Sequence, residues 1–103
     1  MDDHEFKDFV ASLSRGLMKD KDQITKIKAA ASAHWFTCAQ AIAMSDVVKG
    51  HPGEAVITLY SALSDADANF DKVLKNLKWI EERVEVIDAL KLDKNKYAAL
   101  LKK

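Results

Sequence analysis

Hydrophobic residues recur every three or four positions along nearly the whole chain, and no segment alternates polar and apolar residues for long. This spacing places apolar side chains on one face of a helix, so it predicts helices rather than strands. Three glycines and one proline provide few points at which a helix must end. The pattern therefore predicts an all-α protein of six to seven short helices.

Seven groups of apolar residues mark the predicted helices. In chain order they are Phe6, Phe9, Val10, Leu13 and Leu17; Ile24, Ile27 and Ala31; Trp35, Phe36, Cys38, Ala39, Ile42, Ala43, Met44 and Val47; Val56, Leu59, Tyr60 and Leu63; Phe70, Val73, Leu74 and Leu77; Ile80, Val84, Ile87 and Leu90; and Tyr97, Leu100 and Leu101. The third group covers almost every side of its helix, which is typical of a helix that is contacted on several faces.

Polar residues before two of these groups are suited to capping a helix. Asp20 or Asp22 can accept hydrogen bonds from the free N–H groups at the start of the second helix, and Gln23 is spaced to complete a capping box with Asp20. Asn69 is placed to cap the fifth helix. These residues predict where the two helices begin.

Glycine and proline mark further boundaries. We expect the first helix to end near Gly16, and the third to run from residue 34 or 35 to residue 48 before Gly50 stops it. Pro52 is expected in the first turn of the fourth helix, where its missing N–H would have no partner in any case.

The predicted helices show a weak internal repeat. Phe6, Phe36, Phe70 and Tyr97 stand at the same point before an apolar stripe, and they follow one another at spacings of 30, 34 and 27 residues. A helical hairpin of this size cannot bury its apolar face alone, so neighbouring hairpins must stack. We therefore expect one domain over residues 1–103, built from stacked αα-hairpins as a small solenoid with a right-handed superhelical twist.

The distribution of charge supports this order. Residues 29–64 contain only three charged side chains, Asp46, Lys49 and Glu54, so we expect the middle of the chain to be buried. The whole sequence has 16 basic and 16 acidic residues. With no net charge to attract polyanions, we expect neither nucleic acid nor a membrane surface as a partner.

One pair of residues could carry chemistry. His34 and Cys38 are four residues apart, which would bring them together on a helix as a base and a thiol nucleophile or as two metal ligands. Around them, Trp35, Phe36 and Tyr60 could line a pocket, which predicts a small enzyme or a ligand-binding sensor as one alternative. The apolar neighbours of Cys38 favour a structural thiol instead, because burial raises a thiol pKa.

Alternating acidic and amide side chains form a second candidate. Asp65, Asp67, Asn69 and Asp71 resemble the start of a calcium-binding loop, but the sixth position holds phenylalanine and the twelfth holds asparagine. A polar turn that favours the N-terminal end of the next helix is the preferred interpretation. We expect no catalytic residues, no cofactor and no metal site.

The chain also resembles a known helical family. The similarity extends over residues 6–90 to the family known as domain of unknown function 4476, and it is carried by Trp35-Phe36-Thr37-x-x-Gln40, Leu59-Tyr60, Asp65 to Asn69-Phe70-x-x-Val73-Leu74, and Arg83 with Leu90. That family has no assigned catalytic residues, so the resemblance implies a helical fold more than a function.

These observations favour a non-catalytic adaptor that binds a protein or peptide in an apolar groove between helices. The residues expected to contact the partner are Trp79, Arg83, Tyr97, Leu100 and Leu101. Trp79 lies off the apolar stripe of its neighbours, close to Arg83, and both residue types are frequent in binding hot spots. The apolar edge of the last segment must either close the stack of helices or dock on a partner.

The N-terminal residues and the single cysteine bear on location. Met1 to Glu5 lacks the basic and apolar blocks of a signal peptide, and one cysteine cannot form an internal disulfide. We therefore expect a cytoplasmic protein.

Overall fold

The structure, a computed structural model, describes residues 2–15 and 18–102. Within these residues it contains the α-helices α1 (Asp3–Leu13), α2 (Asp20–Ala33), α3 (Cys38–Val47), α4 (Pro52–Leu59), α5 (Ala66–Asn76) and α6 (Ile80–Leu90), and the 3-10 helices η1 (Tyr60–Ala62) and η2 (Ala98–Leu101). The all-α prediction is confirmed. The predicted ending of the first helix at Gly16 and Leu17 lies outside the described residues.

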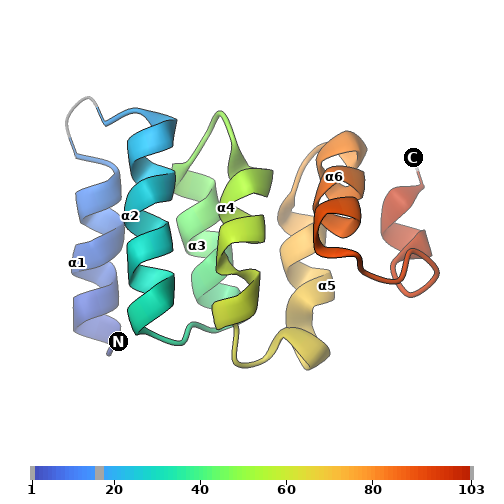
Figure 1. The fold of residues 1–103 in the computed structure, drawn as a ribbon, viewed down its shortest axis with the longest axis horizontal. Helices are drawn as coiled ribbons and strands as arrows, with labels where there is room; N and C mark the ends of the chain where they lie inside the picture. Colours follow the sequence, from blue (N-terminus) through green and yellow to red (C-terminus); the bar gives the residue numbers. More distant parts are fainter. Residues whose placement is uncertain (1, 16–17, 103) are drawn as a thin grey trace.

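The helices follow one another along the longest axis of the molecule (Figure 1). The odd-numbered helices α1, α3 and α5 contact one another in order, and the even-numbered helices α2, α4 and α6 do the same. Helices α3 and α4 join the two sets at the centre. The solenoid of stacked αα-hairpins and its right-handed twist stay predictions.

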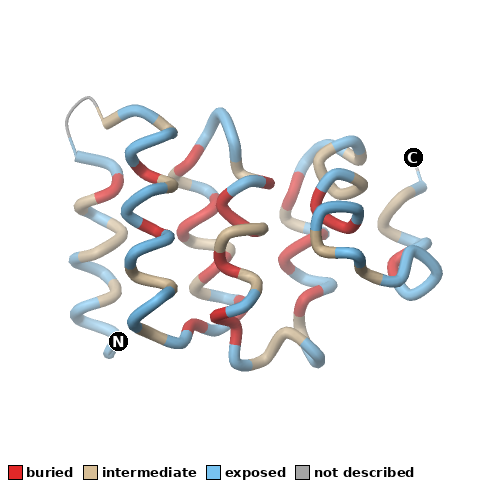
Figure 2. The backbone as a smooth tube through the Cα atoms, in the orientation of Figure 1, coloured by how far each residue is buried: buried red, intermediate tan, exposed pale blue. Residues whose placement is uncertain are grey.

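The core lies where the chain has fewest charges. Buried residues are concentrated on α3, α4 and α5, while α1 contributes only Leu13 and exposes most of its surface (Figure 2). Ala41, Met44 and Val48 are fully buried, as the charge-poor middle segment predicts. The apolar stripe of α5 is likewise buried through Phe70 and its neighbours.

Trp35 contradicts the prediction that the whole third group is buried. Its side chain is 69% exposed, whereas the adjacent Phe36 is 1% exposed. Helix α3 begins only at Cys38, so these two residues lie in an extended connection instead of a helix. Neighbouring side chains of extended backbone point to opposite sides, and here Phe36 takes the inward position.

A capping box explains the later start of α3. The Thr37 hydroxyl accepts a hydrogen bond from the Gln40 N–H at 3.2 Å, and the Gln40 side chain accepts one from the Thr37 N–H at 2.9 Å. Because these two residues satisfy each other's free N–H groups, the helix starts directly after Thr37. The predicted start at residue 34 or 35 is therefore wrong.

The predicted capping box of α2 is also wrong. Lys19 occupies the cap position, and Gln23 is buried instead of reaching back to Asp20. Its side-chain amide donates to the carbonyl of Leu13 at 2.8 Å and to that of Val47 at 3.4 Å. Because Gln23 lies on α2, these two bonds connect α2 to the end of α1 and to the end of α3.

The start of α4 is as predicted, with Pro52 in its first turn. Asn69, in contrast, lies inside α5 and does not cap it, because the helix already begins at Ala66 with Asp65 at the cap position. None of the described helices is both long enough and apolar enough to cross a bilayer.

Candidate functional site

The structure separates His34 from Cys38. His34 ends α2 in an extended conformation, and its ring packs against Phe36 with 6.4 Å between the ring centroids. Cys38 begins the next helix and is 1% exposed. The predicted one-turn spacing is wrong because the chain between the two residues is not helical. A base and a thiol in these positions do not form a nucleophilic pair.

The environment of Cys38 also keeps its thiol protonated. Burial is the main cause that raises the pKa of Cys38 to about 12, and the neighbouring Asp65 carboxylate contributes by stabilising the thiol form and repelling a thiolate. The hollow beside His34 and Trp35, of about 200 Å³, is completed by Ser61 and Ala62 on η1. The predicted pocket walls Phe36 and Tyr60 do not line it.

Asp65 has a structural function in place of the proposed calcium site. One oxygen of its carboxylate accepts a hydrogen bond from the Cys38 N–H at 2.7 Å, and the other accepts one from the Asn69 amide at 3.0 Å. Burial raises the pKa of Asp65, but these hydrogen bonds together hold it below its ordinary value. Asp65 thereby caps α3 from a position 27 residues further along the chain.

The other members of this acidic segment, for which calcium binding is the less favoured alternative, do not surround an ion. Asp67 and Asp71 are exposed on helix α5, so their carboxylates follow a helical surface and not a loop. Within the part of the chain that the structure describes, no three His, Cys, Asp or Glu residues are grouped to hold a metal.

Four of the five predicted partner contacts also take part in the packing of the fold, and their contact with a partner stays a prediction. The Arg83 guanidinium donates three hydrogen bonds, to the carbonyls of Leu77 at 2.9 Å, Leu100 at 2.8 Å and Lys75 at 2.9 Å. Because Leu100 belongs to η2, Arg83 fastens the C-terminal segment to the α5–α6 hairpin.

Aromatic packing completes this closure. Tyr97 is 6% exposed and its ring meets Phe70 edge to face, with 6.2 Å between centroids. Leu100 and Leu101 are half-buried against the core. The last segment therefore closes the stack, which is the first of the two alternatives that its apolar edge allowed.

Trp79 is the predicted contact that remains available. Its side chain is 65% exposed. Helix α5 ends at Asn76, the buried Leu77 anchors the chain, and Trp79 takes an extended conformation at the cap of α6. The indole therefore projects from the short connection between two helices, outside the packed faces of both.

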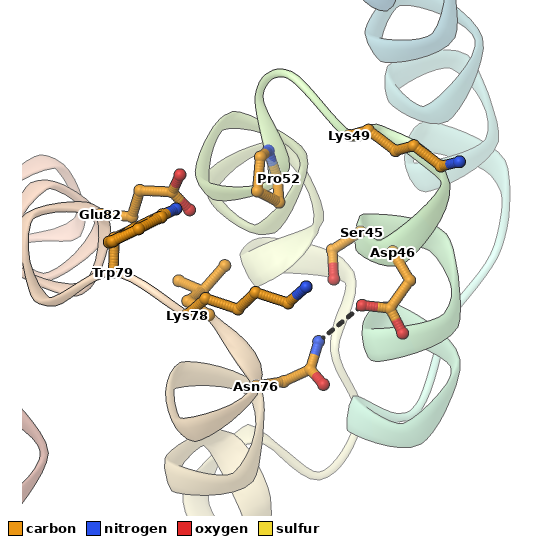
Figure 3. A pocket seen from close by; sticks show the side chains of 9 residues that line it. Ser45, Asp46, Lys49, Pro52, Asn76, Lys78, Trp79 and Glu82 are labelled. Carbon is orange, nitrogen blue, oxygen red and sulfur yellow. Dashed lines mark hydrogen bonds between the residues drawn. The ribbon is translucent and has the colours of Figure 1, made fainter.

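An open groove of about 660 Å³ adjoins Trp79. Asp46 and Lys49, at the end of α3, form one side of it, and Lys78, Trp79 and Glu82, at the start of α6, form the other (Figure 3). The remaining lining residues are Ser45, Pro52, Asn76 and Leu77. The expected apolar groove is thus mixed in character, with four charged side chains in its wall.

One hydrogen bond spans the groove. The Asn76 amide donates to the Asp46 carboxylate at 2.8 Å and joins the end of α5 to the end of α3 (Figure 3). Sequence reasoning missed both residues as members of a site. Asp46 and Lys49 carried a signal, because they are two of the three charges in residues 29–64. Charged side chains kept in a segment that has few others indicate an exposed position.

Comparison with known proteins found no matching family, no matching curated protein and no matching solved structure.

Proposed function

We propose that this protein is a non-catalytic helical module that binds a peptide, or an exposed segment of another protein, in the groove beside Trp79. The observation that supports this function is a tryptophan that is 65% exposed at the edge of an open groove of about 660 Å³. Tryptophan is enriched among residues that dominate binding energy, because its large rigid surface is costly to leave in water. The groove offers hydrogen-bonding and charged groups around that anchor.

A non-catalytic function agrees with the positions of the reactive side chains. The pair that would have supported the alternative of a small enzyme or ligand sensor, His34 and Cys38, is divided between a helix end and the buried start of the next helix. A thiol with a pKa of about 12 is not ionised at neutral pH and is a poor nucleophile.

Cytoplasmic location is part of the same proposal. The single cysteine is free and buried. With its cysteine free, the described part of the chain does not depend on a disulfide, and such a protein is suited to a reducing compartment.

The test uses peptides selected from a displayed library of random short sequences. The full chain is used as bait, and the affinity of a selected, fluorescently labelled peptide is then measured by anisotropy for the wild type and for Trp79→Ala. We expect the substitution to weaken binding by about 30-fold, the effect of losing a hot-spot residue.

Trp35→Ala is the matched control because Trp35 is equally exposed, at 69%, but does not line this groove. Its affinity for the same peptide should equal that of the wild type. If the library yields no binder, or if Trp35→Ala loses affinity while Trp79→Ala keeps it, the proposed function is wrong.

A further inference from the structure

The groove has two ends with different charges. Trp79 at the cap of α6 and Glu82 in its first turn lie close to Pro52, and this end has one negative charge (Figure 3). At the other end, Lys78 extends toward Asp46, and Lys49 lies on the same side of the opening (Figure 3). These three side chains sum to one positive charge. A groove with this polarity orients any charged segment that enters it.

The two acidic side chains of the groove are not equally satisfied. Asp46 accepts the hydrogen bond from Asn76 at 2.8 Å. Glu82 is half-buried, and its Oε2 atom is buried without a hydrogen-bond partner among the described residues. A carboxylate that has lost part of its water without gaining a partner is unfavourable, and a cation placed against it would recover that free energy.

Trp79 favours the same kind of ligand. The face of an indole ring attracts an ammonium or guanidinium group, and tryptophan does so more strongly than the other aromatic residues. Pro52 supplies an apolar surface in the wall of the same groove. Lysine and arginine have aliphatic stems that pack against such surfaces while their charged ends reach a carboxylate.

Building on the function proposed above, we infer that the bound segment places one lysine or arginine side chain between Trp79 and Glu82. The stem of this side chain packs on the indole and on Pro52, and its charged end pairs with the Glu82 carboxylate. Lys49 and Lys78 repel a second basic residue and attract an acidic one. The partner is therefore a peptide of mixed charge with a single basic anchor, and not a polybasic segment.

The experiment determines which peptides the groove selects. Library selection on the wild-type chain should enrich sequences that contain a lysine or arginine with an acidic residue nearby. Replacing the basic residue of a selected peptide by glutamine should weaken its binding about tenfold, the equivalent of one desolvated charge pair.

Protein variants locate the recognition. Glu82→Gln keeps the size of the side chain. Its affinity for the original peptide should be about tenfold lower than that of the wild type. Its affinity for the glutamine-substituted peptide should equal that of the wild type for the same peptide. Glu81→Gln is the matched control, because Glu81 is the exposed neighbour in the same helical turn and does not line the groove. It should bind both peptides as the wild type does. Thermal melts confirm that both variants are folded.

Two groups of results separate this inference from the proposed function. If selected peptides bind in a Trp79-dependent manner but lack basic residues, or if Glu82→Gln leaves their affinity unchanged, the inference is wrong and the groove is still the binding site. The inference is also wrong if Glu81→Gln weakens binding as much as Glu82→Gln, because the attraction is then unspecific. Loss of Trp79 dependence contradicts the proposed function itself.

Discussion

The two edges of the helical stack are built differently. At the edge that carries the α2–α3 and η1–α5 connections, the Phe36 N–H donates to the Ala62 carbonyl and the Ser64 N–H donates to the Phe36 carbonyl, both at 2.8 Å. At the opposite edge, the α3–α4 and α5–α6 connections meet through the side chains of Asn76 and Asp46. Paired backbone crosses the first edge, which has only the smaller hollow of about 200 Å³ beside His34, and the second edge has the open groove of about 660 Å³.

The local conformation of the connections explains this difference. Phe36 and Leu63 are extended and form a single parallel bridge, in which the N–H and carbonyl of Phe36 bond to the residues on either side of Leu63. At the other edge, the His51 N–H donates to the Val48 carbonyl and the Leu77 N–H donates to the Leu74 carbonyl. These two connections form hydrogen bonds within their own turns, and the groove lies between them.

Removing the Phe36 side chain at the first edge should cause the largest loss of stability. Phe36→Ala deletes a side chain that is 1% exposed, and we expect unfolding to become easier by about 3–5 kcal/mol. Trp35→Ala is the control, since this neighbouring aromatic residue is exposed and should change stability by less than about 0.5 kcal/mol. Urea denaturation measures both values. Equal losses for the two variants would contradict the assignment of Phe36 to the core.

Removing the Asp65 cap should cause the second largest loss of stability. Asp65→Ala removes the acceptor of the Cys38 N–H and should cost about 1–2 kcal/mol, whereas Asp67→Ala, on the exposed surface of α5, should cost little. Both variants are compared by urea denaturation.

The same cap predicts a pH dependence. The pKa of Asp65 in the folded protein lies below its ordinary 3.8, so its contribution is present above that pH and is lost as the pH falls through the folded value. Asp65→Asn should flatten the acid limb of a plot of stability against pH. An unchanged limb would show that the carboxylate does not act as described.

The hydrogen bond across the groove should contribute less. Asn76→Ala removes a bond on the exposed side of the molecule, and we expect a loss of about 0.5–1 kcal/mol. A double-mutant cycle with Asp46→Ala should show that the two losses are not additive. Full additivity would mean that the open edge is held together by other contacts.

The smallest effect concerns His51, whose Nδ1 lies 2.9 Å from the Asp20 carboxylate and connects the open edge to α2. The contact with Asp20 is the main cause of a raised His51 pKa, which Glu54 and Glu85 raise further and desolvation lowers. The contribution of this contact to stability is therefore fully present below pH 6.5, and it is lost as the pH rises through the higher pKa that His51 has in the folded protein.

Gly50 provides a second way to remove that contact. A Cβ atom at Gly50 would collide with the Asp20 carboxylate and displace it from His51. Gly50→Ala and His51→Gln should both abolish the decrease in stability from mildly acidic to mildly alkaline pH. If the decrease persists in His51→Gln, another group is responsible.

The helical core could be predicted from the sequence because its signal is local. Phe70, Val73 and Leu74 recur at helical spacing, and all three are buried as that spacing requires. The start of α3 was misplaced because the Thr37–Gln40 capping box ends the preceding extended segment, and apolar periodicity does not reveal such a stop. The cap that Asp65 provides to Cys38 joins two segments of chain that no local pattern connects.

The candidate site was predictable only in part. Trp79 stood apart from the apolar stripes and is exposed, but Asp46 and Asn76 face each other across 30 residues of chain. Arg83 and Tyr97 were predicted as contacts for a partner, and their residue types would suit one. In the structure Arg83 bonds to main-chain carbonyls and Tyr97 packs on the Phe70 ring. Both contacts depend on the path of the chain after α6.

The closure by Arg83 concentrates mutational sensitivity at one position. Its three acceptors are main-chain carbonyls, which are present whatever side chains occupy residues 75, 77 and 100. Substitutions at those residues leave the bonds intact so long as packing allows. Arg83 itself has no equivalent, because the ammonium of lysine cannot reproduce the planar, forked array of donors. The side-chain hydrogen bond that attaches the last segment to α6 thus depends on one residue, while Tyr97 and the two leucines supply the apolar part of the attachment.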